Sequence, residues 1–298
     1  MHRNEAVFLD ESMASSSPFI TRTVLPSKRI PKNEQSVWSI LKNGIGKDFS
    51  RLTMPIVFNE PLSFIQRLAE YMENIHLLRQ AASSTDPIER MEYIGAFAVS
   101  TLSSQRLSKP FNPLLFETYE LERKEMGFRF VAEQVSHHPP ISVFHASDFR
   151  GEFEFYGNVA PKLRFWGRSL EIVPNAHFTV HLSKWNETYT WNAVNISVYN
   201  IILGQLYMVL NGTLVVKCHA SKSDFRLNFK DSGLKASPEF LASGEILINK
   251  EKVRGIYGNF SQYIASVSPT IFAANFERFQ KMFREFAVNN AGVYLYIV

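Results

Sequence analysis

The sequence predicts an α+β fold that is predominantly antiparallel β, with a pair of helices before a sandwich or barrel of strands. Hydrophobic and polar residues alternate through much of residues 119–257, and a period of two is typical of strands with one buried face. Residues 61–106 show helical periodicity instead. No glycine-rich loop leads from a strand into a helix, which argues against a nucleotide-binding fold.

The beginning of the chain is predicted to be a linker that precedes one large domain. Residues 1–33 are polar and rich in serine and proline, which favours a flexible arm, and the domain would occupy residues 34–298. Trp38, Leu41 and Ile45 recur at spacings of three and four, and predict a short amphipathic helix within residues 34–52. This helix would either pack on the core or act as a movable lid over an opening.

Two helices are expected between residues 61 and 106. Asn59-Glu60-Pro61 would open the first, whose apolar stripe consists of Phe64, Leu68, Tyr71, Ile75 and Leu78. Asp86-Pro87-Ile88-Glu89 has the residues of a capping box, with proline at the first helical position. It would start a second helix that runs to about Arg106, antiparallel to the first.

The strands expected between residues 115 and 260 each have one apolar face. The alternating apolar residues are Phe128, Phe130 and Ala132, then Phe153 and Phe155, then Phe225, Leu227 and Phe229. Turn residues such as Asp231-Ser232-Gly233 separate such strands, and this spacing predicts a sandwich or barrel. The apolar stretch Ala193–Leu210 contains three amide side chains, which favours two buried strands over a membrane span.

The end of the sequence predicts an amphipathic helix at residues 270–288 with an aromatic stripe. The stripe consists of Phe272, Phe276, Phe279, Phe283 and Phe286. It would pack on the barrel, or else occupy a groove, a partner chain or a membrane surface.

The composition is that of a soluble globular protein with many phenylalanines. Hydrophobic residues make up 45% and charged residues 20%, while 25 phenylalanines indicate a wide apolar interior. A net charge of +4 favours anionic partners such as acidic membranes. The sequence lacks a basic block with interleaved aromatic residues, which argues against nucleic-acid binding. The single cysteine, Cys218, excludes an intramolecular disulfide, and residues 1–10 lack the apolar segment of a secretory signal. We therefore expect a cytosolic protein.

The octapeptide Glu133–Pro140 contains two adjacent histidines followed by two prolines. Histidine titrates near neutral pH and donates from both ring nitrogens when protonated, and proline favours an extended backbone before it. The segment is interpreted either as a rigid strand end that binds a phosphate or as a proline-terminated strand with two surface histidines.

Three segments of the sequence resemble the ligand-binding domain of the oxysterol-binding protein family, whose members bind and transfer lipids in the cytosol. They are Met54–Pro61 with Gln66–Leu68, Lys109–Leu115, and the octapeptide Glu133–Pro140. The first segment, with Ser36–Leu41, is most similar to the animal subgroup that transfers cholesterol and phosphoinositides. The likeness extends from about Ser36 to Pro269.

The resemblance implies a large incomplete β-barrel that encloses one lipid in a tunnel, with Trp38, Leu41 and Ile45 in an N-terminal lid or lining the tunnel. It implies that Lys109 and Asn112 contact the headgroup phosphate of a phosphoinositide, and that His137 and His138 hold its 4-phosphate. An ammonium, an amide and two imidazoles suit a phosphate. Taken singly, Lys109 is better explained as a surface cation and Asn112 as a turn residue before Pro113; it is their combination that favours a phosphate site. The resemblance also implies exchange of sterol and phosphatidylinositol 4-phosphate between membranes, with peripheral contact to anionic bilayers.

Three features depart from the family pattern. Phe116 occupies a position where the family has glycine, so that the tunnel would be narrowed or Asn112 shifted. The family domain continues beyond the end of this chain, which predicts a C-terminally truncated domain with an incomplete headgroup site. Val7–Glu11 matches only loosely, around Phe8 and Asp10, the acidic phenylalanine motif that binds an endoplasmic reticulum adaptor.

Two alternatives to lipid transfer remain. The chain would be a lipid sensor or membrane-contact tether that binds without exchanging, if truncation leaves the tunnel open. A hydrolase is the other alternative, but adjacent strand residues such as His137 and His138 point to opposite faces and suit one metal poorly. The sequence has no HExxH and no G-x-S-x-G, so we expect no catalytic residues, metal ligands or cofactor.

Overall fold

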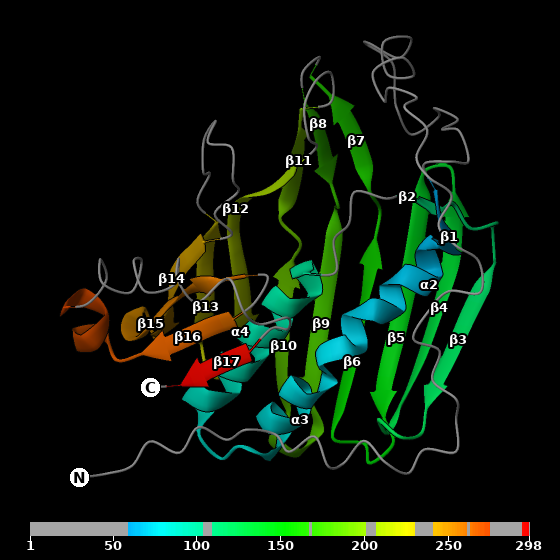
Figure 1. Cartoon of the computed structure of the whole chain (residues 1–298). Helices are drawn as coiled ribbons and strands as arrows, with labels where there is room; N and C mark the ends of the chain where they lie inside the picture. Colours follow the sequence, from blue (N-terminus) through cyan, green and yellow to red (C-terminus); the bar gives the residue numbers. More distant parts are fainter. Residues whose placement is uncertain are drawn as a thin grey trace. The chain divides into compact units, whose positions relative to one another are not determined.

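The fold is described from a computed structural model, which describes residues 59–103, 109–166, 169–200, 207–229, 241–260, 263–274 and 294–297. A long, mostly antiparallel sheet dominates it (Figure 1). The sheet runs in the order β17-β16-β15-β14-β13-β12-β10-β9-β6-β5-β4-β3, and β11, β8 and β7 continue from β12. Its two ends do not pair with each other among the described residues, so the sheet is the incomplete barrel that we expected.

The strands have the following bounds: β1 Asn59–Ser63, β2 Lys109–Phe111, β3 Thr118–Arg123, β4 Phe128–His137, β5 Pro140–Asp148, β6 Phe153–Val159, β7 Lys162–Phe165, β8 Leu170–Val173, β9 Ala176–Leu182, β10 Glu187–Asn192, β11 Asn195–Tyr199, β12 Tyr207–Cys218, β13 Ser223–Phe229, β14 Leu241–Ile248, β15 Glu251–Asn259, β16 Tyr263–Val267 and β17 Tyr294–Ile297. Two pairs are parallel, β1 with β2 and β16 with β17. The strands β11 and β12 confirm that Ala193–Leu210 contributes strands rather than one helix.

The alternation read from the sequence sets the two faces of the sheet. Phe128, Phe130, Phe153, Phe155, Phe225, Leu227 and Phe229 are all buried, as predicted. The rings of Phe155 and Trp191 stack with centroids 5.8 Å apart, and Phe97 from a helix meets Phe155 edge to face at 5.0 Å. Burial of aromatic side chains is a large source of stability, and here it joins the sheet to the helices.

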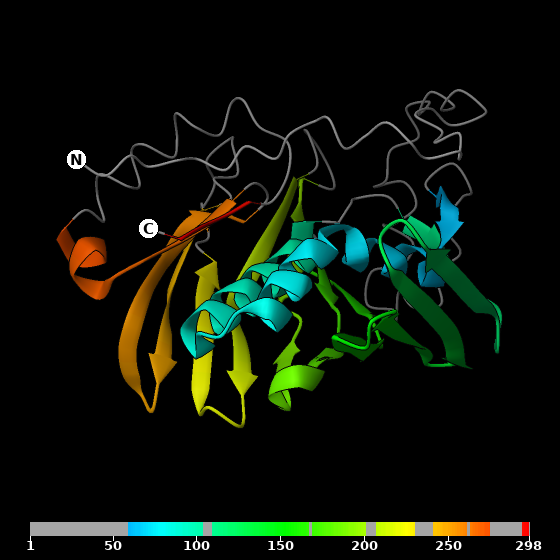
Figure 2. The same ribbon diagram turned by 90° about the horizontal axis from the view of Figure 1, so that it is seen from below.

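Three helices lie in the hollow of the curved sheet (Figure 2). They are α2 (Phe64–Leu68), α3 (Ile75–Ser83) and α4 (Pro87–Ser103), and the 3₁₀ helix η5 (Ala69–Asn74) connects the first two. α2 packs on β4, α3 on β6, and α4 on β12 and β13. The short connection after Ser83 returns the chain alongside α3, which confirms the antiparallel helix pair.

The predicted start of the first helix is wrong. Asn59–Ser63 is the strand β1, and helix begins only at Phe64 because Ser63 and Gln66 form a reciprocal capping box. The apolar stripe is nevertheless buried as predicted, at Leu68, Tyr71, Ile75 and Leu78. The spacing of apolar residues therefore located the buried face without fixing where the helix begins.

The second helix begins at Pro87, as predicted, but its cap differs from a capping box. The Ile88 backbone N–H donates to the Asp86 carboxylate at 2.8 Å, so Asp86 is the N-terminal cap. The Glu89 carboxylate does not reach back to Asp86; it accepts a 2.7 Å hydrogen bond from the Ser84 hydroxyl, which in turn accepts from the Asp86 N–H. Ser84 therefore takes the place of the reciprocal bond.

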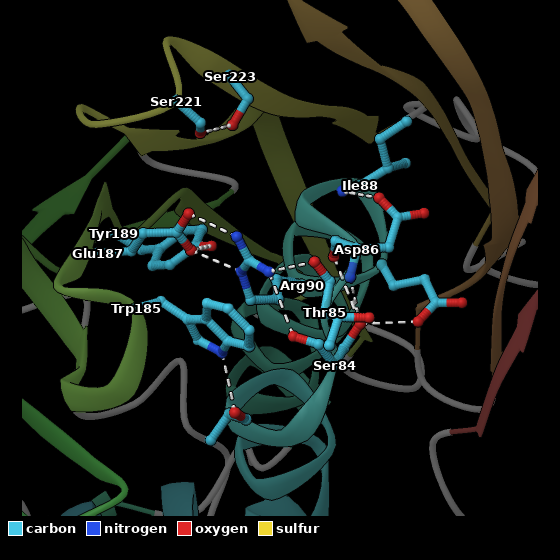
Figure 3. Close-up of polar contacts among 12 residues, drawn as sticks. Ser84, Thr85, Asp86, Ile88, Arg90, Trp185, Glu187, Tyr189, Ser221 and Ser223 are labelled. Atoms are coloured by element: carbon cyan, nitrogen blue, oxygen red, sulfur yellow. Dashed lines mark hydrogen bonds and ion pairs between the residues drawn. The ribbon is translucent and has the colours of Figure 1, made fainter.

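Arg90 fastens α4 to the sheet (Figure 3). Its Nε and Nη2 donate to the two carboxylate oxygens of Glu187 on β10 at 2.7 and 2.8 Å. Its Nη1 donates to the carbonyl oxygens of Ser84 and Thr85, and its guanidinium lies 4.3 Å from the centroid of the Trp185 ring. The Tyr189 hydroxyl donates to Glu187 at 2.7 Å. The buried pair is thus fully hydrogen bonded, which is the condition under which such pairs are tolerated.

The far edge of the sheet is extended by the end of the chain. β17 pairs with β16, and residues 269–274, which begin with Pro269, are helical. Phe272 of this segment packs against Tyr257, with ring centroids 6.1 Å apart, and Lys252 Nζ lies 4.6 Å from its ring centroid. The helix predicted for residues 270–288 thus begins with packing on the sheet, and its part beyond residue 274 lies outside the described residues.

Candidate functional site

His137 and His138 lie where β4 turns into β5. The two strands pair up to His137 and Pro140, so His138 and Pro139 form a two-residue connection with a cis peptide bond between them. The imidazole rings of the two histidines meet edge to face, with centroids 4.7 Å apart. Our expectation that they point to opposite faces is wrong, because His138 lies in the turn rather than in the strand.

A β-bulge precedes the two histidines. The pairing of β4 with β5 shifts between Gln134 and Ser136, which leaves Val135 as the extra residue. The Gln134 side chain is buried and spans the bulge, because its Nε2 donates to the Ser136 carbonyl oxygen at 2.9 Å. Its Oε1 accepts from the Ser142 hydroxyl on β5. Gln134 therefore fixes the backbone that leads into His137.

The two imidazoles differ in their surroundings. His138 is exposed, whereas His137 is half-buried, and its Nδ1 has no hydrogen-bond partner in the described part of the chain. A buried polar atom without a partner costs about 1–3 kcal/mol. The site therefore retains a polar group that a ligand oxygen would satisfy.

Lys109 and Asn112 come from a short strand and the loop after it. β2 begins at Lys109, which pairs with Asn59 of β1, and Asn112 is exposed just after this strand. Lys109 is half-buried, and this burial lowers the pKa of its ammonium group. Among the residues that the structure describes, no carboxylate pairs with Lys109. An anionic ligand would supply the charge that this lysine lacks.

Backbone hydrogen bonds connect this loop with β4, just before the turn at His138 and Pro139, which we call the histidine turn. The Phe116 N–H donates to the Gln134 carbonyl oxygen at 2.9 Å, and the Gln134 N–H donates to the Glu117 carbonyl oxygen at 3.0 Å. Figure 1 shows β2 at the same end of the sheet as the turn between β4 and β5. The structure therefore brings the four residues singled out from the sequence to one end of the sheet, on two adjoining segments.

Phe116 adopts a backbone conformation that favours glycine. Its φ is +65°, and it is the third residue of a turn closed by the Glu117 N–H and the Leu114 carbonyl oxygen at 3.0 Å. A positive φ at this turn position is easily adopted by glycine and strains other residues. The side chain is 68% exposed, so it does not fill the apolar interior as we had considered. The glycine that the resemblance implies at this position would adopt this backbone conformation without strain.

Gln134 is a structural residue of the site that motif and spacing arguments did not identify. Gln134 continues the inward-facing series of Phe128, Phe130 and Ala132, and it is the polar member of that series. A polar residue at an inward position of a strand must find partners, and here these are Ser136 and Ser142. A polar residue at an inward position of an otherwise apolar series was the sequence signal that could have identified Gln134 as a structural residue of the site.

Several predicted features lie outside the described residues. They are the lid residues Trp38, Leu41 and Ile45, the possible adaptor motif at Phe8 and Asp10, and the aromatic stripe beyond residue 274. Within the described ranges, no group of three or more His, Cys, Asp or Glu residues is arranged to hold a metal ion. The helices described there are too short or too polar to cross a membrane.

The sequence matches a model of the oxysterol-binding protein family over residues 36–283. It is 47% identical over 256 residues to oxysterol-binding protein-related protein 1 of Homo sapiens, and the matched region covers 85% of this chain and 27% of that protein. It is 45% identical over 263 residues to oxysterol-binding protein-related protein 2 of Mus musculus, with 87% of this chain and 54% of the relative covered. The chain thus spans about a quarter to about half the length of these relatives.

Solved structures share the fold. The Osh1 ORD domain in complex with cholesterol superposes with a TM-score of 0.76 at 33% identity, covering 83% of this chain and 59% of that one. The Osh3 ORD of Saccharomyces cerevisiae in complex with PI(4)P gives a TM-score of 0.70 at 33% identity, covering 77% and 62%.

Proposed function

The chain belongs to the oxysterol-binding protein family, and on this premise we propose that it binds a sterol or a phosphoinositide and exchanges these lipids between membranes. The observation that carries the proposal is the presence, at one end of the sheet, of two imidazoles in contact and of a half-buried lysine that has no carboxylate partner among the described residues. Relatives of the same fold are complexed with cholesterol and with PI(4)P. These two ligands define the lipid classes to test first.

The chemistry of the four residues supports a phosphate ligand. Lys109 contributes a point charge, Asn112 an amide donor, and His137 and His138 imidazole nitrogens. Donors that are charged give the shorter and stronger hydrogen bonds to phosphate oxygens. A phosphate monoester beside Lys109 also favours the ammonium form, which burial alone disfavours. We propose that His137 and His138 hold the 4-phosphate of phosphatidylinositol 4-phosphate and that Lys109 and Asn112 contact its headgroup phosphate.

The inner face of the sheet is aromatic, and part of it is buried against the helices, where Phe97 of α4 meets Phe155 and Tyr71 of η5 meets Phe144. Phe130, Phe144, Phe155 and Phe178 lie side by side there, and Phe130 and Phe144 stack with centroids 5.7 Å apart. We propose that a tunnel for one lipid lies on this side of the sheet, covered by the lid predicted for residues 34–52. The role is one of binding and carriage, and we assign no catalytic residue.

Vesicle transfer assays test the function. Donor vesicles carry labelled sterol or phosphatidylinositol 4-phosphate, and transfer to acceptor vesicles is followed with the whole chain, with His137→Ala/His138→Ala, and with His145→Ala as a matched control. His145 is an exposed histidine of β5 that lies away from the turn. We expect the double variant to lose phosphoinositide transfer and to retain sterol transfer, and the control to retain both.

Two results would change the proposal. Saturable lipid binding without net transfer would replace exchange by the role of a sensor or tether at membrane contact sites. An unchanged phosphoinositide transfer in the double variant would contradict the headgroup assignment. We further propose a cytosolic location with peripheral contact to anionic membranes. An endoplasmic reticulum adaptor is a candidate partner, to be tested by pull-down with Phe8→Ala and Asp10→Ala.

A further inference from the structure

An exposed apolar loop lies beside the candidate headgroup site. We call residues 111–116 the rim loop. Its large apolar side chains are exposed to an unusual degree, with Phe111 at 41%, Leu114 at 72%, Leu115 at 48% and Phe116 at 68%. Several large apolar side chains exposed within one short segment are typical of an interaction site.

The exposed apolar residues concentrate at one end of the sheet. Trp166, which is 67% exposed, directly follows β7. Figure 1 shows β7 ending on the side of the sheet that also carries β2 and the turn between β4 and β5. Val135 in the bulge is exposed there as well. By contrast, Phe149 is exposed in the connection between β5 and β6, which lies at the opposite end of β5.

The charges around the rim loop favour an anionic partner. Lys162 and Arg164 on β7 are exposed close to Trp166, and in the described part of the chain Lys162, like Lys109, has no carboxylate partner. Two of the acidic groups nearby are engaged within the protein. Glu117 accepts a 2.8 Å hydrogen bond from the Leu114 N–H, and Glu171 lies 3.8 Å from Arg164. Apolar tips with aromatic residues and unpaired lysines are the features of a surface that enters the headgroup region of a bilayer.

The conformation of Phe116 supports a role outside the folded core. Its backbone is held at φ +65°, where glycine is favoured, and its phenyl group contributes little burial. Such a residue weakens the fold of the free chain, while its exposed phenyl group is available to a surface outside the fold.

We propose that the rim loop inserts Leu114 and Phe116 into an anionic bilayer, with Trp166 as a second contact, so that the histidine turn faces the lipid headgroups. This inference rests on the proposed function, because insertion here brings the candidate headgroup site to the membrane. It adds the residues that anchor the chain during exchange.

Vesicle flotation tests the insertion separately from headgroup binding. The vesicles contain phosphatidylcholine and phosphatidylserine, without sterol or phosphoinositide. We expect Phe116→Gly to lower vesicle affinity roughly tenfold, since one buried phenyl group is lost from the bilayer. The same variant is expected to unfold at a higher temperature, so weaker binding would not reflect misfolding. Phe149→Ala, at the opposite end of β5, is the matched control and is expected to bind as the unaltered chain does.

An environment-sensitive fluorophore gives a second readout. Cys218 is buried, so a cysteine introduced by Leu114→Cys is the accessible one for labelling. We expect its emission to shift to the blue on addition of vesicles, and the label on a Phe149→Cys variant to stay unchanged. No shift at position 114, or unchanged flotation of Phe116→Gly, would overturn the insertion.

Two further outcomes are distinguishable. If the chain self-associates without vesicles and Phe116→Gly abolishes this, the rim loop contacts a second copy and the membrane proposal is wrong. Binding of a water-soluble, short-chain phosphatidylinositol 4-phosphate needs no bilayer, and we expect Phe116→Gly to retain it. Loss of that binding in His137→Ala/His138→Ala together with unchanged flotation of Phe116→Gly would retain the proposed function and reject insertion.

Discussion

Gln134 and Ser136 are joined across the bulge in β4 by a 2.9 Å hydrogen bond from the amide Nε2 to the carbonyl oxygen. The same side chain accepts a hydrogen bond from Ser142 on β5, so one buried amide holds both strands of the hairpin. His137 follows Ser136 directly. The position of the imidazole therefore depends on a residue that does not belong to the candidate headgroup site.

Replacement of Gln134 tests this dependence. Gln134→Ala removes both hydrogen bonds, and we expect the free energy of unfolding to fall by about 1–3 kcal/mol. We expect the affinity for short-chain phosphatidylinositol 4-phosphate to fall about tenfold, if misplacement of the imidazoles costs roughly one charge-assisted hydrogen bond. Urea denaturation and isothermal titration calorimetry measure the two effects.

A double-mutant cycle separates positioning from general loss of structure. In the His137→Ala/His138→Ala background, Gln134→Ala should have little further effect on headgroup affinity while still lowering stability. If Gln134→Ala lowers headgroup affinity as much in the double-histidine variant as in the unaltered chain, Gln134 does not act through the histidines.

Phe116→Gly should stabilise the fold. The change removes the strain of a non-glycine residue at φ +65°, which costs about 1–2 kcal/mol, and the entropy of glycine in the unfolded chain offsets a part. We expect a net gain of about 1 kcal/mol in urea denaturation. Leu115→Gly, at the preceding turn position, should give no gain. Equal effects of the two substitutions would mean that φ at residue 116 is not the cause.

The pair Arg90–Glu187 should be among the most sensitive contacts of the fold. Glu187→Ala leaves the Arg90 guanidinium buried without its partner, and we expect a loss of about 3–5 kcal/mol in the free energy of unfolding. The exposed pair Arg129–Glu120 is the matched control, because both side chains are more than half exposed. Glu120→Ala should cost no more than about 1 kcal/mol. Similar losses at the two sites would contradict the importance of burial.

Glu92 should make stability fall as pH rises above the ordinary carboxyl range. Burial raises the pKa of Glu92 above 4.5, although hydrogen bonds from Ser266 and Arg254 lower it in part. A raised pKa in the folded state means that the native protein binds more protons than the unfolded chain. The free energy of unfolding therefore decreases as pH rises from about 4.5 through the folded-state pKa.

The Glu92→Gln variant isolates this contribution. We expect its stability to decline less than that of the unaltered chain between pH 4.5 and pH 7, because the amide does not titrate. Urea denaturation across this range measures the difference. Parallel pH profiles for the two proteins would show that Glu92 does not carry the effect.

Much of the fold was predictable because it depends on local patterns. Alternation at Phe128, Phe130 and Ala132 identified a strand with its buried face, and Asp86-Pro87 identified a helix start. The start of the first helix was misplaced because the capping residue, Ser63, follows Pro61 and the preceding residues pair with β2. Strand pairing between distant segments leaves little local signal.

The candidate site was predictable in its residues but not in its geometry. The octapeptide named both histidines, yet their rings face each other only because His138 lies in a two-residue turn. Phe116 lies in a turn closed locally by Leu114 and Glu117, and two backbone hydrogen bonds attach this turn to Gln134, which is distant in the sequence. Such features follow from tertiary structure, which the sequence patterns did not specify.

Calorimetric titration with two water-soluble lipids tests the central claim most directly. Short-chain phosphatidylinositol 4-phosphate and short-chain phosphatidylinositol differ by the 4-phosphate alone. We predict that the unaltered chain binds the first at least about tenfold more tightly, as expected for one or two charge-assisted hydrogen bonds, and that His137→Ala/His138→Ala binds both equally. Equal affinity of the unaltered chain for the two lipids, or a preference that persists in the double variant, would contradict the account.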